Sequence, residues 1–423
     1  MSSTWEEGMT ADRYPALKGD FTADAVVVGG GITGVSAAYF LSGSGKRVIL
    51  IDKENLKETV SAYTTAFLTY VTDTSLTELV DLYDRESARM VWQSGVDAID
   101  MIETSIIENK IDCEFMRCDQ FIFAGEPKEW RGIASDVRLA RGMGFDVKKY
   151  DDALPFKNYG AAVVRSQAKF HPVKYLKQLK KIAQDKGALV FDDSEAVSVE
   201  GYAPIIVKTE YAGIEAPYVF IATHEPFNSP LKLFARKAEY TSYVIELGIK
   251  AGLLKEAMYL DQHNPYHYFR LDRGVNGLDR LVLGGEDHRH ELPIDEEKVY
   301  TALEEYLKSL MPGITYEIKK KWSGPIIEPI DALPYIGSYM EDYPNYYVGT
   351  GFSGNGMTYG TLAGRMFANL VLGVGSPYTE IYTPLRKAKV RRVLRKGKDF
   401  AQEFVGGYLR DVVKRPKKRD GTE

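Results

Sequence analysis

The sequence predicts an α/β protein of two lobes, one of them built around a Rossmann-like strand–helix–strand unit. Three observations lead to this fold class. The chain has 423 residues, which is more than one hydrophobic core usually serves. A glycine-rich turn follows an apolar strand at residues 24–34, as in nucleotide-binding units. Further segments of the same type recur far apart along the chain, so both lobes should be discontinuous in sequence.

The first element is a glycine fingerprint. Residues 26–28 are three consecutive valines, typical of a parallel strand buried on both faces. Gly29 permits the tight turn, Gly31 lets the backbone approach a pyrophosphate, and Gly34 permits close packing of helix on strand. The helix that follows directs its free N–H groups and its positive dipole end at the phosphates. The run therefore predicts a dinucleotide site.

The second strand of this unit, residues 48–52, ends in an acidic residue. Asp52 can accept a hydrogen bond from a ribose 2′-OH, which favours FAD or NAD over NADP. The fingerprint alone leaves FAD and NAD both open. From this unit we expect the following residues to bind the cofactor: Gly29, Gly31, Ile32, Thr33, Gly34, Asp52 and Lys53.

Helical and strand periodicities alternate along the rest of the chain. Helices are expected at residues 75–109, 172–186, 295–311 and 360–372. Strands are expected at residues 115–124, 161–164, 189–191, 205–209, 218–223, 240–247, 267–270, 281–285 and 346–349. We assign residues 1–75, 165–230 and 320–375 to the cofactor-binding domain, 76–164 and 231–319 to a β-sheet-based substrate domain, and 376–423 to a basic helical tail.

A second glycine-rich turn, residues 349–360, lies between the last strand and the last helix. Its helix start supplies a second set of free backbone N–H groups. A reduced flavin gathers negative charge at its N1–C2=O edge, and such a helix start can stabilise that charge. NAD has no comparable need, so the pair of turns favours FAD.

These residues resemble the D-amino-acid-oxidase (DAO) superfamily of FAD-dependent oxidoreductases, which includes glycine, sarcosine and γ-glutamylputrescine oxidases. The resemblance runs from about Trp5 to about Gly375. Besides the fingerprint, it rests on Trp-Ser-Gly at residues 322–324, on residues 331–337, and on the turn at residues 351–358. It implies a glutathione-reductase-like FAD fold, with the Rossmann-like FAD-binding domain joined to a discontinuous substrate domain.

Within the superfamily the chain is most similar to a bacterial branch usually fused to a C-terminal Rieske domain. The similar segments are residues 61–69, 265–270 and 284–288. By this resemblance Ser61, Thr64 and Thr65 lie near the FAD phosphates or the isoalloxazine, and Val197 binds adenine through its backbone. The second turn is expected to contact the flavin ring or ribityl chain through Gly351, Gly354, Asn355, Gly356, Met357 and Thr358.

Three departures from this branch stand out. Its lysine in the first run is Phe67 here, and the tryptophan often found in its glycine turn is Asn355. A Rieske cluster needs two cysteines and two histidines, and no cysteine follows Cys118 in this sequence. The residues given therefore provide no Rieske site of their own, and no metal site is expected.

The substrate end of the predicted site lacks a carboxylate clamp. Relatives that resemble glycine oxidase carry an arginine shortly after the Trp-x-Gly, where it holds a substrate carboxylate in a bidentate manner. Pro325, Ile326 and Ile327 stand there in this chain. Arg270 or Arg273 could substitute, or each could serve a surface salt bridge. We expect an amine, a polyamine derivative or a bulky secondary amine.

All six histidines follow residue 170. His267 and His288, with Tyr266 and Tyr268, could line the substrate side of the flavin, or they could be packing residues of the β-rich lobe. The candidate catalytic residues are His267, Tyr268, Arg270 and His288.

Charge is distributed unevenly along the chain. Residues 385–423 contain 14 lysines and arginines against five acidic residues, whereas the whole chain has a net charge of −5. A basic amphipathic helix can dock an acidic partner or lie on an anionic membrane surface, or it can pack on the protein's own acidic body. Only two cysteines occur, Cys113 and Cys118, which fits a reducing cytoplasm. No nucleic-acid partner is expected, because the body is acidic.

Together these features predict an FAD-dependent oxidoreductase that oxidises a C–N bond of an amine or imino compound. The electrons pass to O₂ or to a protein acceptor, and the basic tail could bind an acidic redox protein. The alternative is a flavoprotein electron-transfer subunit that works with an iron–sulfur partner.

Overall fold

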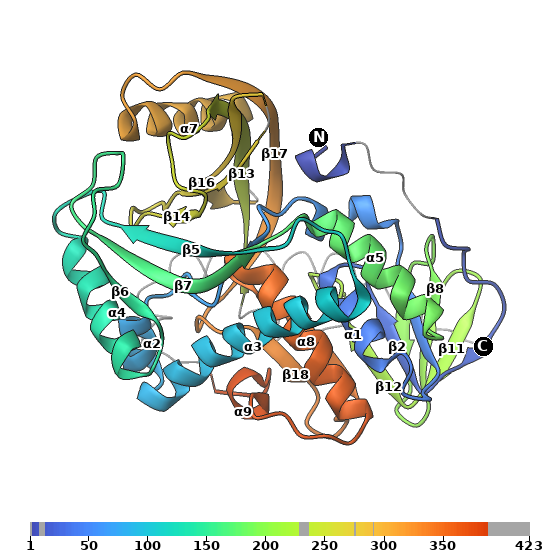
Figure 1. The fold of residues 1–423 in the computed structure, drawn as a ribbon. Helices are drawn as coiled ribbons and strands as arrows, with labels where there is room; N and C mark the ends of the chain where they lie inside the picture. The colour runs from blue at the N-terminus through green and yellow to red at the C-terminus, as the bar shows by residue number, and fades with distance from the viewer. Residues whose placement is uncertain (1, 8–12, 228–236, 275, 291, 388–423) are drawn as a thin grey trace.

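The computed structural model describes residues 2–7, 13–227, 237–274, 276–290 and 292–387. Figure 1 shows two regions: β13, β16, β17 and α7 at one end, and a second sheet with α1 and α5 at the other. The second sheet has six strands, in the order β18 (Tyr335–Ser338), β19 (Tyr346–Thr350), β12 (Tyr218–Ile221), β2 (Ala25–Val28), β3 (Val48–Ile51) and β8 (Leu189–Phe191). All its neighbouring strands are parallel except β18 and β19.

This six-stranded sheet is the middle of three layers. Alternate residues of β2, such as Ala25 and Val27, pack in the cluster that includes the helices, whereas Val26 and Val28 pack with Ile205 on the opposite face. The helical layer contains α1 (Ile32–Leu41), α3 (Arg85–Asn109), α5 (Pro172–Asp185) and α8 (Gly356–Val371). The opposite layer is a four-stranded sheet in the order β1 (Phe21–Thr22), β11 (Gly213–Ala216), β10 (Ile205–Lys208) and β9 (Ser198–Glu200).

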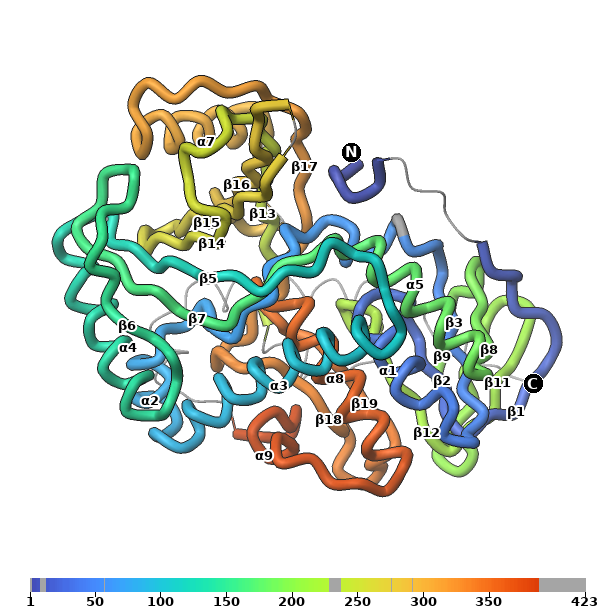
Figure 2. Tube along the Cα trace, viewed as in Figure 1, coloured from blue at the N-terminus to red at the C-terminus, as the bar shows by residue number. Residues whose placement is uncertain are grey.

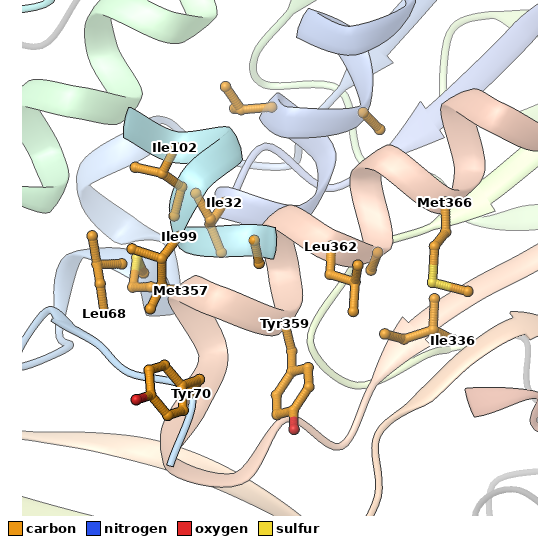
Figure 3. Close-up of a cluster of buried hydrophobic side chains, with 14 of the residues drawn as sticks. Ile32, Leu68, Tyr70, Ile99, Ile102, Ile336, Met357, Tyr359, Leu362 and Met366 are labelled. Carbon is orange, nitrogen blue, oxygen red and sulfur yellow. The ribbon is translucent and has the colours of Figure 1, made fainter. Parts of the chain in front are cut away.

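Helices α1 and α8 pack closely because glycines lie at their contact. A Cβ on Gly360 would come within 2.7 Å of Ile32 Cγ2, and one on Gly364 within 2.6 Å of the Ala37 nitrogen. Figure 3 shows the apolar core around these helices, with side chains from α1, α3 and α8 in one cluster. This packing brings the N-terminal ends of α1 and α8 to the same part of the molecule.

The region that contains β13, β16, β17 and α7 is built on a nine-stranded mixed sheet. Its path is β17 (Tyr316–Pro329), β13 (Lys237–Lys250), β16 (Leu278–Arg289), β15 (Tyr268–Asp272), β14 (Met258–Leu260), β5 (Met116–Phe123), β7 (Ala161–Lys169) and β4 (Phe67–Leu68), with β6 (Val147–Tyr150) paired to β7. Helix α7 (Glu296–Leu310) packs on one face of β13 and β16. In Figure 2 the long strands β5 and β7 run from the side of α4 (Trp130–Gly142) and α2 (Leu76–Leu82) toward α5, so they link the two regions.

The α/β fold class is confirmed, with differences in individual elements. The helix expected at residues 75–109 is two helices, because Asp84 caps a new one: its carboxylate accepts the Ser87 N–H at 2.7 Å. The last helix begins at Gly356, four residues before the expected start. Helix α4 and strand β17 were not predicted, and β13 and β16 are longer than expected.

The division of the chain into domains stays a prediction. Helix α3 lies within residues 76–164, assigned to the substrate domain, but it packs on α8 of the cofactor region. Of the tail, the structure describes α9 (Thr379–Tyr382) and the residues up to 387; residues 388–423 lie outside the described residues. Among the described helices, none combines the length and apolar character needed to cross a membrane.

Candidate cofactor and substrate site

One large cavity is lined by residues of both sheets. Its volume is about 900 Å³, near the upper end of the range of about 300–1,000 Å³ for ligand pockets. The lining begins at the first glycine turn and at Asp52, follows residues 58–73 and the second glycine turn, and ends on β13 and β15. The two glycine turns, 320 residues apart in the chain, thus meet at a single site.

One end of the cavity, where the sequence predicts the ribose and which we call the ribose end, is formed at the tip of β3. The carboxylate of Asp52 accepts the N–H groups of Gly30 and, at 2.8 Å, of Glu54. Burial raises the pKa of Asp52, and these two backbone donors oppose that rise. The strand end and the turn therefore fix the carboxylate where it can meet a ribose hydroxyl.

Both helices that begin at the cavity lack a side-chain cap. Gly31 at the start of α1 has no side chain to offer, and Asn355 at the start of α8 makes no capping bond. The Asn355 amide instead donates to the Val71 carbonyl at 2.8 Å. Ser61 Oγ accepts the Ile32 N–H at 2.9 Å, which leaves its own O–H to donate to an anion. The other N–H groups of these first turns are those that an anionic ligand can use.

Three side chains donate hydrogen bonds to the backbone carbonyls of the loop at residues 63–66. Trp322 Nε1 donates to the Tyr63 carbonyl at 2.9 Å, and Trp5 Nε1 donates to the Thr64 carbonyl at 2.6 Å. Arg270 Nη1 donates to the carbonyls of Thr65 and Ala66, each at 3.1 Å. In a trans peptide the N–H points away from the preceding carbonyl. Fixing these carbonyls therefore fixes the opposite side of the loop, where Thr64 lines the cavity.

Most of the predicted cofactor residues line this cavity. They are Gly29, Gly31, Ile32, Thr33, Asp52, Lys53, Ser61, Thr64, Thr65, Val197, Gly354, Asn355, Gly356 and Met357. Three others do not line it. A Cβ on Gly34 would lie 1.8 Å from the Gly29 oxygen, so Gly34 serves helix–strand packing. Gly351 (φ +72°) forms the turn, and Thr358 Oγ1 donates to the Thr69 carbonyl at 3.2 Å.

The four catalytic candidates are not brought together. Tyr268 lines the cavity. His267 lies between two carboxylates, with Nδ1 3.2 Å from Asp261 and Nε2 3.0 Å from Glu286, and its ring stacks on Tyr306. Burial opposes the charged ring, but the two carboxylates raise the pKa of His267 overall. His267 thus ties β16 to the loop before β15 rather than facing the cavity.

Arg270 and His288 also lie off the cavity. Arg270 is 2 % exposed, pairs with Asp272 at 2.9 Å, and holds the loop carbonyls described above. The guanidinium also lies 5.1 Å from the ring centroid of Trp5. His288 stacks on Tyr243, on the face of the sheet that α7 covers. Neither residue lines the cavity. His288 thus matches the packing alternative of the sequence analysis, and Arg270 forms a salt bridge that is buried rather than on the surface.

Several lining residues were missed. Ser242 and Val244 alternate along β13 and both line the cavity. The sequence could have predicted that these two residues share a face, because alternate side chains of a strand point to the same side of the sheet. Asp73 and Gln120 also line the cavity, and neither stands in a recognisable motif.

The cavity lining is acidic. Lys53 is the only lysine or arginine among the described lining residues, and it lies beside Asp52 at the ribose end. Burial lowers the pKa of His224 to about 4, so this lining residue is neutral at pH 7. The acidic lining residues are Asp52, Glu54, Glu58, Asp73, Glu195 and Glu225.

These features fit FAD. An acidic ribose partner, two uncapped helix starts and a glycine at each close approach suit the two ends of a long dinucleotide. A Cβ on Gly31 would lie 3.1 Å from Ser61 Oγ, so a side chain there would crowd the hydroxyl group beside the predicted phosphate site. At the far end, the aromatic and aliphatic lining suits a flat ring system.

The family profile described as "FAD dependent oxidoreductase" (DAO) matches residues 24–370. YhfW of Bacillus subtilis (strain 168), whose name places it among Rieske 2Fe-2S iron–sulfur proteins, is 29% identical over 411 residues, covering 96% of this chain and 80% of YhfW. Gamma-glutamylputrescine oxidoreductase of Escherichia coli (strain K12) is 22% identical over 377 residues, covering 85% of this chain and 86% of that enzyme. The crystal structure of glycine oxidase from Geobacillus kaustophilus has a similar fold, with a TM-score of 0.73 at 17% identity, over 87% of this chain and 99% of the other.

Proposed function

The chain belongs to the DAO family of FAD-dependent oxidoreductases, and from that premise we propose that it oxidises a C–N bond of an amine or imino compound. The relatives in the comparisons include an enzyme named for γ-glutamylputrescine and one named for glycine. Within that range, the proposal favours a substrate without a carboxylate beside the reacting carbon.

The observation that carries this proposal is the lining of the substrate end. Ile326 and Ile327 line the cavity at the positions where a carboxylate-binding arginine would follow the Trp-x-Gly. Arg270, the candidate substitute, is committed to Asp272 and to backbone carbonyls. A substrate carboxylate would therefore meet an apolar wall and acidic neighbours. It would lose its hydration there without gaining a hydrogen-bond donor or a cation in return.

The chain's own residues bind and orient the substrate. FAD, when bound, accepts a hydride or its equivalent from the carbon next to nitrogen. Tyr268 and Tyr266 provide aromatic surface and hydroxyl groups in the cavity lining, and Ile326 adds an apolar side chain to it. Apolar and aromatic side chains around the substrate would limit the access of water and hold the carbon in one place, which is what this chemistry requires of a protein.

Anaerobic mixing tests the proposal. The purified holoprotein is mixed with benzylamine, N-methylbenzylamine, putrescine, glycine and proline, and the oxidised-flavin absorbance is followed. We expect bleaching by at least one amine without a carboxylate. If only the two amino acids bleach the flavin, the substrate class is wrong; if dithionite alone does so, the oxidase or dehydrogenase function is wrong.

A second candidate is an electron-transfer flavoprotein that works with an iron–sulfur partner. The similarity to YhfW, named for a Rieske cluster, favours it. Both candidates allow a protein acceptor, and the basic segment at residues 388–423 would suit an acidic one. Reoxidation of the reduced flavin by O₂ and by an acidic ferredoxin separates the acceptors. No bleaching by any amine, with reduction only through the ferredoxin, would favour the second candidate.

The tail is best tested by removing residues 388–423 alone. Arg386 must stay, because its buried guanidinium pairs with Asp331 at 2.7 Å. If the tail binds a redox partner or an anionic membrane, the truncated protein should lose ferredoxin-dependent reoxidation or vesicle binding and keep its reduction by amines. Unchanged behaviour in both assays would contradict a role for the tail.

A further inference from the structure

A chain of hydrogen bonds leads from the substrate end of the cavity into the nine-stranded sheet. Tyr268 lines the cavity, and its hydroxyl lies 2.8 Å from Ser242 Oγ. The Ser242 side chain in turn hydrogen bonds with the carboxyl group of Asp287. The carboxyl oxygen Oδ1 of Asp287 is sealed from solvent and has no hydrogen-bond partner among the described residues. None of the mechanism outlined above uses Ser242 or Asp287.

A β-bulge places Asp287 at this point. The pairing of β13 with β16 shifts between Thr241, opposite His288, and Tyr243, opposite Gly285. Two residues of β16 therefore oppose the single residue Ser242, and one of them, Glu286, has a φ of +56°. Bulges of this kind re-aim a side chain and often lie beside active sites.

The bulge also changes which face of the sheet the following side chains of β16 occupy. In a regular strand the side chain of His288 would share a face with that of Gly284, which is opposite the cavity-lining Val244. Instead His288 stacks on Tyr243 on the other face, and Asp287 turns to Ser242. The bulge that turns His288 away from the cavity face thus places Asp287 beside Ser242.

The surroundings of Asp287 tune its protonation. Burial raises the pKa of Asp287 to about 7, the hydrogen bond from Ser242 opposes this rise, and the nearby carboxylates of Asp73 and Glu328 add to it. His267 favours the charged carboxylate, and the titratable groups of Tyr266 and Tyr268 also face it. Near neutral pH this carboxyl group can therefore both accept and release a proton.

The protonation state sets the direction of the whole chain. An ionised carboxylate only accepts hydrogen bonds, so Ser242 must donate to Asp287 and Tyr268 must donate to Ser242. The Tyr268 oxygen then offers its lone pairs to the cavity. When Asp287 carries a proton, the same bonds can reverse, and Tyr268 becomes a donor to the cavity.

We propose that Tyr268, Ser242 and Asp287 form a proton chain that accepts the proton of the substrate ammonium, which rests on the proposed oxidation of an amine. The N–H⁺ gives its proton to the Tyr268 oxygen, the Tyr268 proton moves to Ser242 Oγ, and the Ser242 proton moves to Asp287. The products are a neutral amine and a neutral carboxyl group. No electron is transferred in this step, and the proton returns by the same path after product release.

Proton transfer from the substrate ammonium to Asp287 is favourable for both groups. An alkylammonium has a pKa of about 10 in water, and oxidation beside nitrogen needs the nitrogen lone pair. In a buried site of low dielectric, an ammonium and a carboxylate that cannot touch are both costly, and proton transfer removes both charges at once.

The first test is the pH dependence of flavin reduction by an amine that bleaches the holoprotein. In the wild type the rate should rise about tenfold per pH unit up to about pH 7 and then level off. In Asp287→Asn it should continue to rise toward the pKa of the amine, about 10. Ser242→Ala should behave like Asp287→Asn, and Ser242→Thr, which keeps the hydroxyl, should restore the wild-type profile. Asp151→Asn, an exposed carboxyl group, is the matched control.

The second test does not depend on turnover. tert-Butylamine has no hydrogen on its α-carbon, so it cannot be oxidised. At pH 8 its binding to the wild-type holoprotein should produce the infrared carbonyl band of a protonated carboxyl group. The band should be absent with tert-butanol and absent in Asp287→Asn. A wild type without this band, or pH profiles identical in the wild type and both the Asp287 and Ser242 variants, would overturn the proton chain. If no amine bleaches the flavin, the proposed function fails instead.

Discussion

The two ends of the cavity are built in different ways. The cofactor end uses backbone: glycine turns, two helix starts, and a loop whose carbonyls are held by Trp322, Trp5 and Arg270. The substrate end uses side chains of a sheet, aimed by a bulge beside Ser242. The difference teaches that binding of FAD tolerates little change in the chain, whereas the choice of substrate rests on a few exchangeable side chains.

The most damaging change we expect is at Gly34, because a side chain there would collide with the backbone of the first glycine turn. In Gly34→Ala the new Cβ would lie 1.8 Å from the Gly29 carbonyl oxygen, and backbone cannot move aside. The cost should exceed the usual range of about 1–3 kcal/mol for overpacking. We expect no holoprotein, measured as the ratio of flavin to protein absorbance after purification.

The matched control is Gly132→Ala in α4, where nothing lies within 4 Å of the new Cβ. A methyl group there should stabilise the helix by about 0.5–1 kcal/mol. If Gly34→Ala binds FAD as well as this control, the cofactor end is less dependent on its backbone than we argue.

Arg270→Met should produce the next largest effect, because it releases the loop carbonyls and leaves Asp272 with one cation fewer. Loss of one partner from a buried ion pair costs about 3–5 kcal/mol. We expect a lower unfolding temperature together with faster release of FAD. The exposed pair of Arg89 with Glu86 supplies the control, since Arg89→Met should change neither quantity. Equal effects in the two variants would show that Arg270 does not position the loop.

The substrate end should affect how the stability of the fold depends on pH. Burial raises the pKa of Asp287 to about 7 in the folded protein, above its value of about 3.9 in an unfolded chain. Between these values the folded state binds more protons than the unfolded state, so stability falls as pH rises from about 4 to about 7. Asp287→Asn removes this dependence, and its unfolding temperature relative to the wild type should be higher at pH 8 than at pH 5.

Asp272 gives the opposite sign and serves as a comparison. Although burial opposes ionisation, Arg270, Arg280 and Lys169 hold the pKa of Asp272 well below its usual range. Its ionised form therefore stabilises the fold at neutral pH, and Asp272→Asn should be less stable than the wild type at pH 5 and at pH 8 alike. Identical pH dependence in the Asp272 and Asp287 variants would contradict this assignment of charges.

The smallest effect should come from Ser61→Ala, which removes one hydroxyl donor from the cofactor end. One hydrogen bond contributes about 0.5–1.5 kcal/mol, so FAD affinity should fall by about two- to tenfold. Ser198→Ala, which removes an exposed hydrogen bond to Glu200, is the control. Equal FAD affinity in the two variants, measured by titration of the apoprotein, would remove Ser61 from the cofactor site.

The contrast between the two ends also explains what the sequence could predict. Gly29, Gly31 and Asp52 were readable because a backbone-built phosphate site requires fixed residue types at fixed spacing. The fold class and the FAD cofactor followed from these positions and from the second glycine turn. The start of α8 at Gly356 lies four residues before the predicted start, because the glycine-rich turn gives no local pattern that separates the turn from the first helical residues.

The substrate end could not be read in the same way. The bulge beside Ser242 depends on how β13 pairs with β16, which is a long-range property, and it reverses the faces of Asp287 and His288. Arg270 resembles a substrate clamp in the sequence, but the fold buries it behind the cofactor loop. Only the placement of strands beside one another distinguishes these roles.

The central claim is that this FAD-dependent oxidoreductase acts on amines that lack a neighbouring carboxylate. The most direct measurement is the rate of anaerobic flavin reduction at saturating N-methylbenzylamine and at saturating N-methylphenylglycine, its α-carboxylated counterpart. We predict faster reduction by N-methylbenzylamine, because the apolar wall at Ile326 and the acidic lining offer a carboxylate no partner. Faster reduction by N-methylphenylglycine would contradict the claim.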